Sequence, residues 1–221
     1  LRRARLILVD VDGVLNEHRQ QFCVTFQQQN AGVQLDPDAI KALPVHRTPN
    51  LGVSKNQERN VFRDVGYWLD MPPSIEAATH LKELRSQGFR VVLATNRPWP
   101  EYDLPGNEKR KRLCDWRQRI APWLGSITSG RWRDRVRLHL RTMRPIEIVT
   151  RAWLRHHKIP FDGIIVERKR NAMIERFLPR NRFALARNQH PMFCVEDDPI
   201  NAVRLSFSCE FVFLLKHPYN E

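Results

Sequence analysis

The chain has 221 residues, of which 42% are hydrophobic, so it can bury a core in one domain with an insertion or in two small domains. Its formal net charge of +13 attracts phosphates on nucleotides, nucleic acids or anionic surfaces, although an arginine-rich, GC-biased genome explains the charge equally well. The sequence has no apolar run near the roughly 20 residues that cross a bilayer, which excludes a membrane-spanning helix.

We expect a soluble protein of a reducing compartment, either the cytoplasm or an organelle matrix. The four cysteines are far apart and form no CxxC pair, which argues against a zinc site and favours thiols packed in the core. The first residue is Leu1, so an N-terminal leader, including an organelle-targeting one, stays open.

The first half of the chain predicts a strand, a helical region, a helix and a second strand. Residues 5–9 form the first strand, and a mostly polar helical region follows, in which residues 35–43 carry a helix-start pattern. The next helix begins at the proline pair before Ser74 and ends at Gly88. Its apolar residues at helical spacing are Ile75, Ala78, Leu81 and Leu84, and a β-branched strand follows over residues 90–96.

The second half repeats this alternation after an interruption. Residues 99–145 are rich in arginine and tryptophan without a clear period, and we interpret them as an insertion. The elements that follow are a helix at 145–159, a strand at 162–169, a helix at 170–177, a strand at 192–198, a helix at 199–206 and a strand at 210–216. Helices alternating with β-branched strands predict an α/β fold built on a parallel sheet.

Polar side chains follow four of the predicted strands. Because loops at the carboxyl ends of neighbouring parallel strands converge on one crevice, we expect these side chains to share a site. They are Asp10 and Asp12, Thr95 and Asn96, Lys169, and Glu196, Asp197 and Asp198. Several carboxylates in one cleft repel one another unless a hard cation lies between them, and oxygen ligands without His or Cys suit Mg²⁺. A lysine and a threonine hydroxyl beside that cation would bind phosphate, which points to phosphoryl transfer.

The ordered series of VDVDG, a Thr-Asn pair, a lone lysine and a terminal Asp-Asp resembles the motifs of the haloacid dehalogenase (HAD) superfamily of phosphohydrolases. The resemblance implies a Rossmann-like parallel sheet with a small helical cap inserted after the first strand. It also implies that Asp10 is the nucleophile that forms an aspartyl-phosphate and that Asp12 is the general acid and base. Thr95 would bind the phosphoryl oxygens, and Lys169 would stabilise their charge.

The same resemblance implies a metal site of Asp10, Asp12 and Asp197, with the backbone carbonyl of Asp12 as one ligand. Asp198 or Glu196 would lie behind these ligands, although Asp198 equally suits the cap of the helix at 199–206.

The segments around residues 62–98 and 146–220 further resemble the 5'(3')-deoxyribonucleotidase family, from which the ATNRP sequence departs. This resemblance implies a core of residues 1–15 and 74–221 and a cap of residues 16–73. It implies substrate contacts from Asn96 and base stacking by Phe62, Tyr67 and Trp68, three rings that are equally suited to a hydrophobic core.

The predicted function is a Mg²⁺-dependent phosphatase that acts on nucleoside monophosphates. The Arg- and Trp-rich residues 108–144 keep two alternatives open, because such surfaces bind nucleic acid. The first is a phosphatase of polynucleotide ends, and the second is an RNA-binding subunit of a ribonucleoprotein whose site is idle. A solvated helix face with tryptophans packed on the core explains the same residues without nucleic acid.

Overall fold

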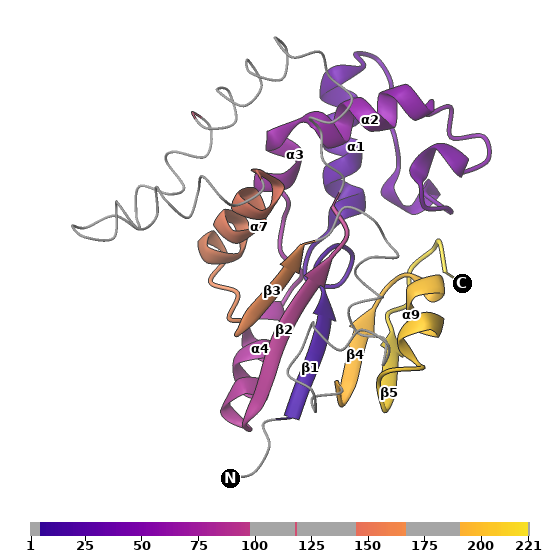
Figure 1. Cartoon of the computed structure of the whole chain (residues 1–221). Coiled ribbons are helices and arrows are strands. Elements are labelled where there is room, and N and C mark those ends of the chain that lie inside the picture. The colour runs from indigo at the N-terminus through magenta and orange to yellow at the C-terminus, as the bar shows by residue number, and fades with distance from the viewer. Residues whose placement is uncertain (1–4, 98–117, 119–144, 167–190, 221) are drawn as a thin grey trace.

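A computed structural model describes residues 5–97, 118, 145–166 and 191–220 (Figure 1). The predicted helix at 170–177 and nearly all of the predicted insertion lie outside these residues. The described elements in chain order are β1 (Arg5–Asp10), α1 (His18–Gln29), η1 (Pro37–Ala39), η2 (Val45–Arg47), α2 (Lys55–Arg63), α3 (Val65–Leu69), α4 (Ala77–Ser86), β2 (Phe89–Thr95), α7 (Pro145–His156), β3 (Gly163–Val166), β4 (Phe193–Glu196), α9 (Pro199–Leu205) and β5 (Phe211–Leu214).

The strands form one parallel sheet in the order β3-β2-β1-β4-β5, which confirms the predicted fold class. The central strand is β1, where Ile7 is paired with Val91 of β2 on one side and with Phe193 of β4 on the other. Because all strands run the same way, their carboxyl ends meet at one edge of the sheet, the edge that faces α1 and α3 in Figure 1.

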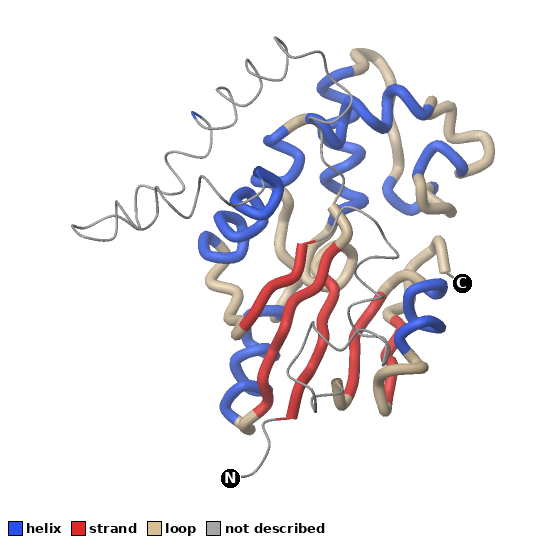
Figure 2. The backbone as a smooth tube through the Cα atoms, in the orientation of Figure 1, coloured by secondary structure: helices blue, strands red, loops and turns tan. Residues whose placement is uncertain are grey.

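Alternate residues of the sheet face opposite layers of helices. Ile7 and Val9 belong to a large hydrophobic cluster with residues of α4 and α7, whereas Leu6 and Leu8 belong to a smaller one with Leu205 of α9. This alternation follows from the two-residue period of a strand. The neighbouring strands β1 and β2 are buried on both faces, which explains why they are continuous apolar runs, whereas β5 at the edge of the sheet is largely exposed (Figure 2).

Helices α1, α2 and α3 pack on one another beyond the carboxyl edge of the sheet. Their inward residues, among them Phe22, Phe26 and Val61, extend the larger hydrophobic cluster without a break from the sheet. Ser54 and Gln57 start α2 with a capping box, in which each side chain bonds the backbone N–H of the other residue. The division between a cap at 16–73 and a core remains a prediction.

Two local predictions were wrong. In the predicted helix at 35–43 only the short η1 forms, because Asp36 caps the N–H of Asp38 at 3.0 Å and Ile40 then adopts an extended backbone. Ile75 is 92% exposed and precedes α4, which begins after Glu76 in a left-handed conformation (φ 64°). The helix therefore begins later in the chain than the spacing of the apolar residues predicted.

None of the described helices is long and apolar enough to cross a membrane. The three cysteines among the described residues, Cys23, Cys194 and Cys209, are buried free thiols, and Cys114 lies outside the described part.

Candidate active site

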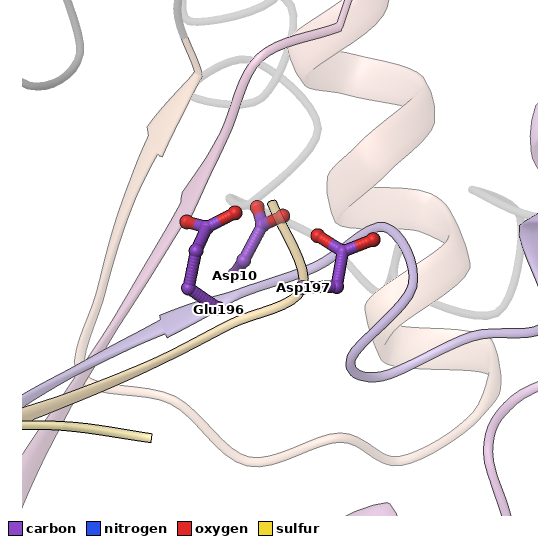
Figure 3. A group of neighbouring side chains, drawn as sticks. All are labelled: Asp10, Glu196 and Asp197. Atoms are coloured by element: carbon purple, nitrogen blue, oxygen red, sulfur yellow. The ribbon is translucent and has the colours of Figure 1, made fainter. Parts of the chain in front are cut away.

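Three carboxylates gather at the carboxyl edge of the sheet. Asp10 ends β1, Glu196 ends β4, and Asp197 follows Glu196 directly. One oxygen from each residue lies within 4.8 Å of the others, and Figure 3 shows the three side chains directed toward a common region. Glu196 and Asp197 are only 2% and 4% exposed. The central strand and its neighbour therefore place three acidic groups together in the protein interior.

The electrostatics of this cluster favour a bound cation. Burial raises the pKa of Asp10 well above its ordinary value, and the charges of Glu196, Asp197 and Asp12 raise it further. A cation between the carboxylates would remove the repulsion that causes part of this shift. Because all three donors are carboxylate oxygens, the residues present fit a hard cation such as Mg²⁺.

The cluster shares two of its three members with the predicted metal set, and the predicted ligation by the backbone carbonyl of Asp12 stays a prediction. Asp10 and Asp197 lie together, but Glu196, predicted to lie behind the ligands, supplies the third oxygen of the cluster. The Asp12 side chain bonds another group of residues. Asp198 caps α9, where its side chain accepts the N–H of Ile200 at 2.9 Å, as its alternative interpretation proposed.

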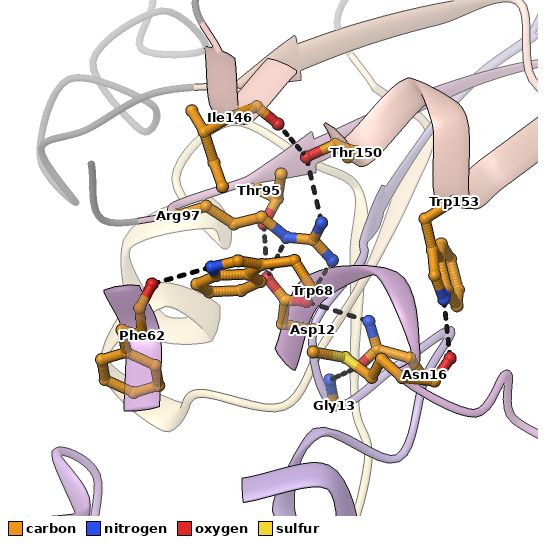
Figure 4. A network of polar contacts seen from close by, with 11 residues as sticks. Asp12, Gly13, Asn16, Phe62, Trp68, Thr95, Arg97, Ile146, Thr150 and Trp153 are labelled. Carbon is orange, nitrogen blue, oxygen red and sulfur yellow. Dashed lines mark hydrogen bonds and ion pairs between the residues drawn. The ribbon is translucent and has the colours of Figure 1, made fainter. Parts of the chain in front are cut away.

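The Asp12 carboxylate is held by four hydrogen bonds (Figure 4). Arg97 donates from Nε to Oδ2 at 2.8 Å and from Nη2 to Oδ1 at 2.6 Å. The Thr95 hydroxyl donates to Oδ2, and the Asn16 amide donates to Oδ1, both at 2.9 Å. Burial by itself would raise the pKa of Asp12, but the charge and hydrogen bonds of Arg97 outweigh it and lower that pKa. Asp12 is therefore held as a carboxylate.

Arg97 is a site residue that the sequence analysis did not single out. Its side chain is fully buried, its Nη1 donates to Thr150 Oγ1 at 3.0 Å, and its guanidinium lies 4.8 Å from the centre of the Trp68 ring. Thr150 in turn donates to the carbonyl of Ile146 at 2.7 Å. An arginine directly after the Thr-Asn pair that ends a strand was the available signal, because it must lie at the same edge of the sheet as the aspartates.

The remaining predicted catalytic residues are only partly within the described chain. Thr95 is 1% exposed and bonds Asp12, which places it beside the predicted general acid. Asn96 is partly buried and follows β2. Lys169 lies outside the described residues, three positions after the last residue of β3.

The three aromatic residues predicted to stack on a base lie together in the interior. Trp68 is nearly parallel to Phe62, with ring centroids 5.9 Å apart, and Tyr67 packs edge-on against Trp68 at 4.6 Å. Tyr67 and Trp68 are 2% and 3% exposed, and the indole N–H of Trp68 donates to the carbonyl of Phe62 at 2.9 Å. In this arrangement Trp68 contacts Arg97 and Phe62, and base stacking remains a prediction.

No protein-family model and no curated protein matches the sequence. Several solved structures share its fold. A provisionally assigned phosphatase from Clostridium difficile has a TM-score of 0.53 at 12% identity, over 96% of this chain and 95% of that chain. A predicted phosphatase from Clostridium acetobutylicum has a TM-score of 0.50 at 11% identity, over 96% of this chain and 94% of that chain.

A chain from the structure of a Pnkp1/Rnl/Hen1 complex has a TM-score of 0.42 at 14% identity. The alignment covers 97% of this chain but 46% of that one, so the present chain spans less than half of that protein's length. Identities this low show the fold alone. The chain has the HAD-like α/β fold of these structural neighbours, and its five-stranded parallel sheet carries the acidic cluster at its carboxyl edge.

Proposed function

We propose that this protein is a Mg²⁺-dependent phosphatase that hydrolyses phosphomonoesters through a phosphorylated Asp10. The observation that carries the proposal is the meeting of Asp10 with Glu196 and Asp197 at the carboxyl edge of a HAD-like sheet. A nucleophilic carboxylate beside two further carboxylates attacks an anionic ester only if their charge is compensated. The acidic cluster would therefore need a bound cation before Asp10 could attack a phosphate substrate.

Asp10, Glu196 and Asp197 would hold the cation. When bound, Mg²⁺ supplies positive charge that keeps Asp10 ionised and offsets the repulsion between its carboxylate and the phosphate. This charge would offset the burial and the neighbouring carboxylates that raise the pKa of Asp10.

Two aspartates would then carry out the reaction, Asp10 as the nucleophile and Asp12 as the general acid and base. A carboxylate oxygen of Asp10 forms a bond to phosphorus while the bond from phosphorus to the ester oxygen breaks, and Asp12 donates a proton to the departing oxygen. Asp12 next accepts a proton from water, whose oxygen attacks phosphorus, so that inorganic phosphate leaves and Asp10 is regenerated. Because Arg97 holds Asp12 in its ionised form, the first cycle requires Asp12 to take a proton from solvent after that ion pair loosens, and each later cycle uses the proton that Asp12 has accepted from the attacking water.

Neighbouring side chains would orient the phosphate. Thr95 is in position to turn its hydroxyl from Asp12 to a phosphoryl oxygen, since it already lies against the general acid. We assign charge stabilisation to Lys169 and substrate contact to Asn96 on the resemblance described above.

We further propose nucleoside monophosphates as substrates. The resemblance to nucleotidases supports this choice, and the net charge of +13 supports an anionic substrate. The helices of residues 16–73 lie beyond the edge that carries the acidic cluster, where a cap would contact the nucleoside. Phe62, Tyr67 and Trp68 remain the candidates for stacking, which would require these packed rings to rearrange.

The test is phosphate release with Mg²⁺ from deoxy- and ribonucleoside monophosphates and from a 3'-phosphorylated oligonucleotide. Asp10→Asn should abolish release from every substrate, because the amide is a far weaker nucleophile. Asp38→Asn, at a side chain that is 79% exposed, is the matched control and should stay active. Release of phosphate from the oligonucleotide alone would instead support a phosphatase of polynucleotide ends. Full activity of Asp10→Asn, or no release from any phosphomonoester, would refute the phosphatase.

A further inference from the structure

Residues 215–220, which we call the clasp, fold back onto Glu196 at the end of β4 and onto Asp197, which follows it. The Leu215 N–H donates to the carbonyl of Glu196 at 2.9 Å, which continues the pairing of β5 with β4. Asn220 then donates from Nδ2 to the carbonyls of Asp197 and Leu215, at 2.6 and 2.7 Å. Its Oδ1 accepts the N–H of His217 at 2.8 Å, so one amide side chain closes the turn of the clasp.

The clasp also contacts the loop that follows Asp10. His217 Nε2 lies 2.8 Å from the carbonyl oxygen of Gly13, and because a carbonyl only accepts, Nε2 carries the proton. The ring of His217 stacks on that of Tyr219, with centroids 5.1 Å apart and planes 13° apart. The clasp therefore connects the loops that follow β1 and β4, the two strands whose ends carry the acidic cluster.

Tyr219 directs its hydroxyl at that cluster. It donates a hydrogen bond to Oδ2 of Asp197, while its ring packs edge-on against His18 and lies under the guanidinium of Arg19, both from α1. A phenol bonded to one carboxylate oxygen restricts the rotation of that carboxylate, and the other oxygen, Oδ1, is then the one that would bind a cation. Hydrogen bonds of this kind to metal-binding carboxylates orient the ligands and tune their affinity.

The backbone at Gly13 makes room for this contact. A Cβ at Gly13 would lie 2.1 Å from Asp197 Oδ2 and 3.0 Å from the Tyr219 hydroxyl oxygen, and Gly13 has a φ of +83°. Only glycine allows the loop after Asp10 to approach the pair so closely. The contact between Tyr219 and Asp197 is thus supported by three segments: the clasp, the loop after β1 and helix α1.

We propose that Tyr219 is a positioning residue of the cation site, which holds Asp197 in the orientation that binds Mg²⁺, with His217 and Asn220 anchoring it. This inference rests on the proposed function, because it takes Asp197 as a ligand of the cation. It adds a residue 22 positions beyond Asp197, in the segment that follows β5.

The test measures Mn²⁺ binding to the metal-free protein by calorimetry and by electron paramagnetic resonance, independently of turnover. Tyr219→Phe should raise the Mn²⁺ dissociation constant about 10-fold, since it removes only the hydroxyl. Ser86→Ala, which removes a hydroxyl that donates to the Glu83 carbonyl on α4, is the control and should bind Mn²⁺ as the wild type does. Asn220→Ala should also weaken binding, because it frees the clasp from the Asp197 carbonyl. Circular dichroism checks that each variant is folded.

The outcomes separate this inference from the proposed function. If the wild type binds Mn²⁺ and Asp197→Asn does not, the cation site stands. Unchanged affinity in Tyr219→Phe would then overturn the positioning role and leave the phosphatase intact. Weak binding in Tyr219→Leu with full binding in Tyr219→Phe would assign the effect to the ring and overturn the role of the hydroxyl. No Mn²⁺ binding by the wild type would overturn both proposals.

Discussion

The pairing of Asp12 with Arg97 makes a quantitative prediction about stability. Arg97 is fully buried, and it donates two hydrogen bonds to the carboxylate and a third to Thr150. Arg97→Met keeps most of the aliphatic volume but removes these bonds and leaves a carboxylate whose side chain is only 22% exposed. Removing one partner of a buried ion pair costs about 3–5 kcal/mol, and the exposed fraction of Asp12 places our expectation near 3 kcal/mol.

A double-mutant cycle tests the origin of this loss. Asp12→Asn should also destabilise, because it leaves the guanidinium buried without its counter-charge. The double variant should be more stable than the sum of the single losses predicts, by about 2–3 kcal/mol, because it contains no unpaired buried charge. Urea unfolding followed by tryptophan fluorescence gives the free energies by linear extrapolation.

The matched control is a partly exposed ion pair within one helix. Arg151 pairs with Glu147 one turn earlier on α7, and both side chains are more exposed than Arg97, at 27% and 22%. Arg151→Met should cost no more than about 1 kcal/mol. Two results would refute the argument that burial makes the Asp12–Arg97 pair important for stability. One is a loss of unfolding free energy in Arg97→Met as small as that in the control, and the other is strictly additive losses in the cycle.

Two further predictions concern the acidic cluster. Gly13→Ala should destabilise the protein more than Gly52→Ala does in urea unfolding, because both glycines have positive φ (83° and 71°) but only at Gly13 does a Cβ meet another group. Both variants share a backbone cost of about 1–2 kcal/mol, so equal losses would exclude the close approach of Asp197. The pH dependence follows from Asp10, whose pKa is raised in the folded protein. Its contribution to stability is fully present below the unfolded pKa, about 3.9, and is lost as pH rises through the folded pKa. Mg²⁺ should therefore raise the melting temperature more at pH 8 than at pH 5, and an equal gain at both values would contradict this.

The sequence predicted the sheet because its signal is local. Continuous β-branched runs such as RVVLAT are buried on both faces, and each strand of a parallel sheet carries that signature within its own residues. The same locality placed Asp10 and Asp197 at one edge, since each ends or follows a strand and parallel strands end together. Helix boundaries were less predictable, because Ile75 fits the apolar period and yet the backbone at Glu76 starts α4 after it.

Contacts between distant segments could not be derived in this way. Arg97 and Asp12 are 85 positions apart, and Trp68, which lies against that guanidinium, comes from a third segment. Either aspartate of the first motif could have faced the acidic cluster. The Asp12 carboxylate is instead bonded by Asn16, Thr95 and a buried Arg97 guanidinium, and Thr150 of α7 bonds the far side of that guanidinium.

By itself, then, the sequence determined the parallel α/β fold and the edge at which its acidic residues gather, since strand polarity and burial are properties of short segments. Tertiary structure alone decided which carboxylates share the cluster, because side-chain direction depends on neighbours far along the chain. It placed Glu196 with Asp10 and Asp197, bound Asp12 to Arg97, and laid Tyr219 against Asp197. The reason is the distance along the chain over which each feature is determined. Periodicity is encoded within a few residues, whereas the partner of a buried charge is set by packing between distant segments.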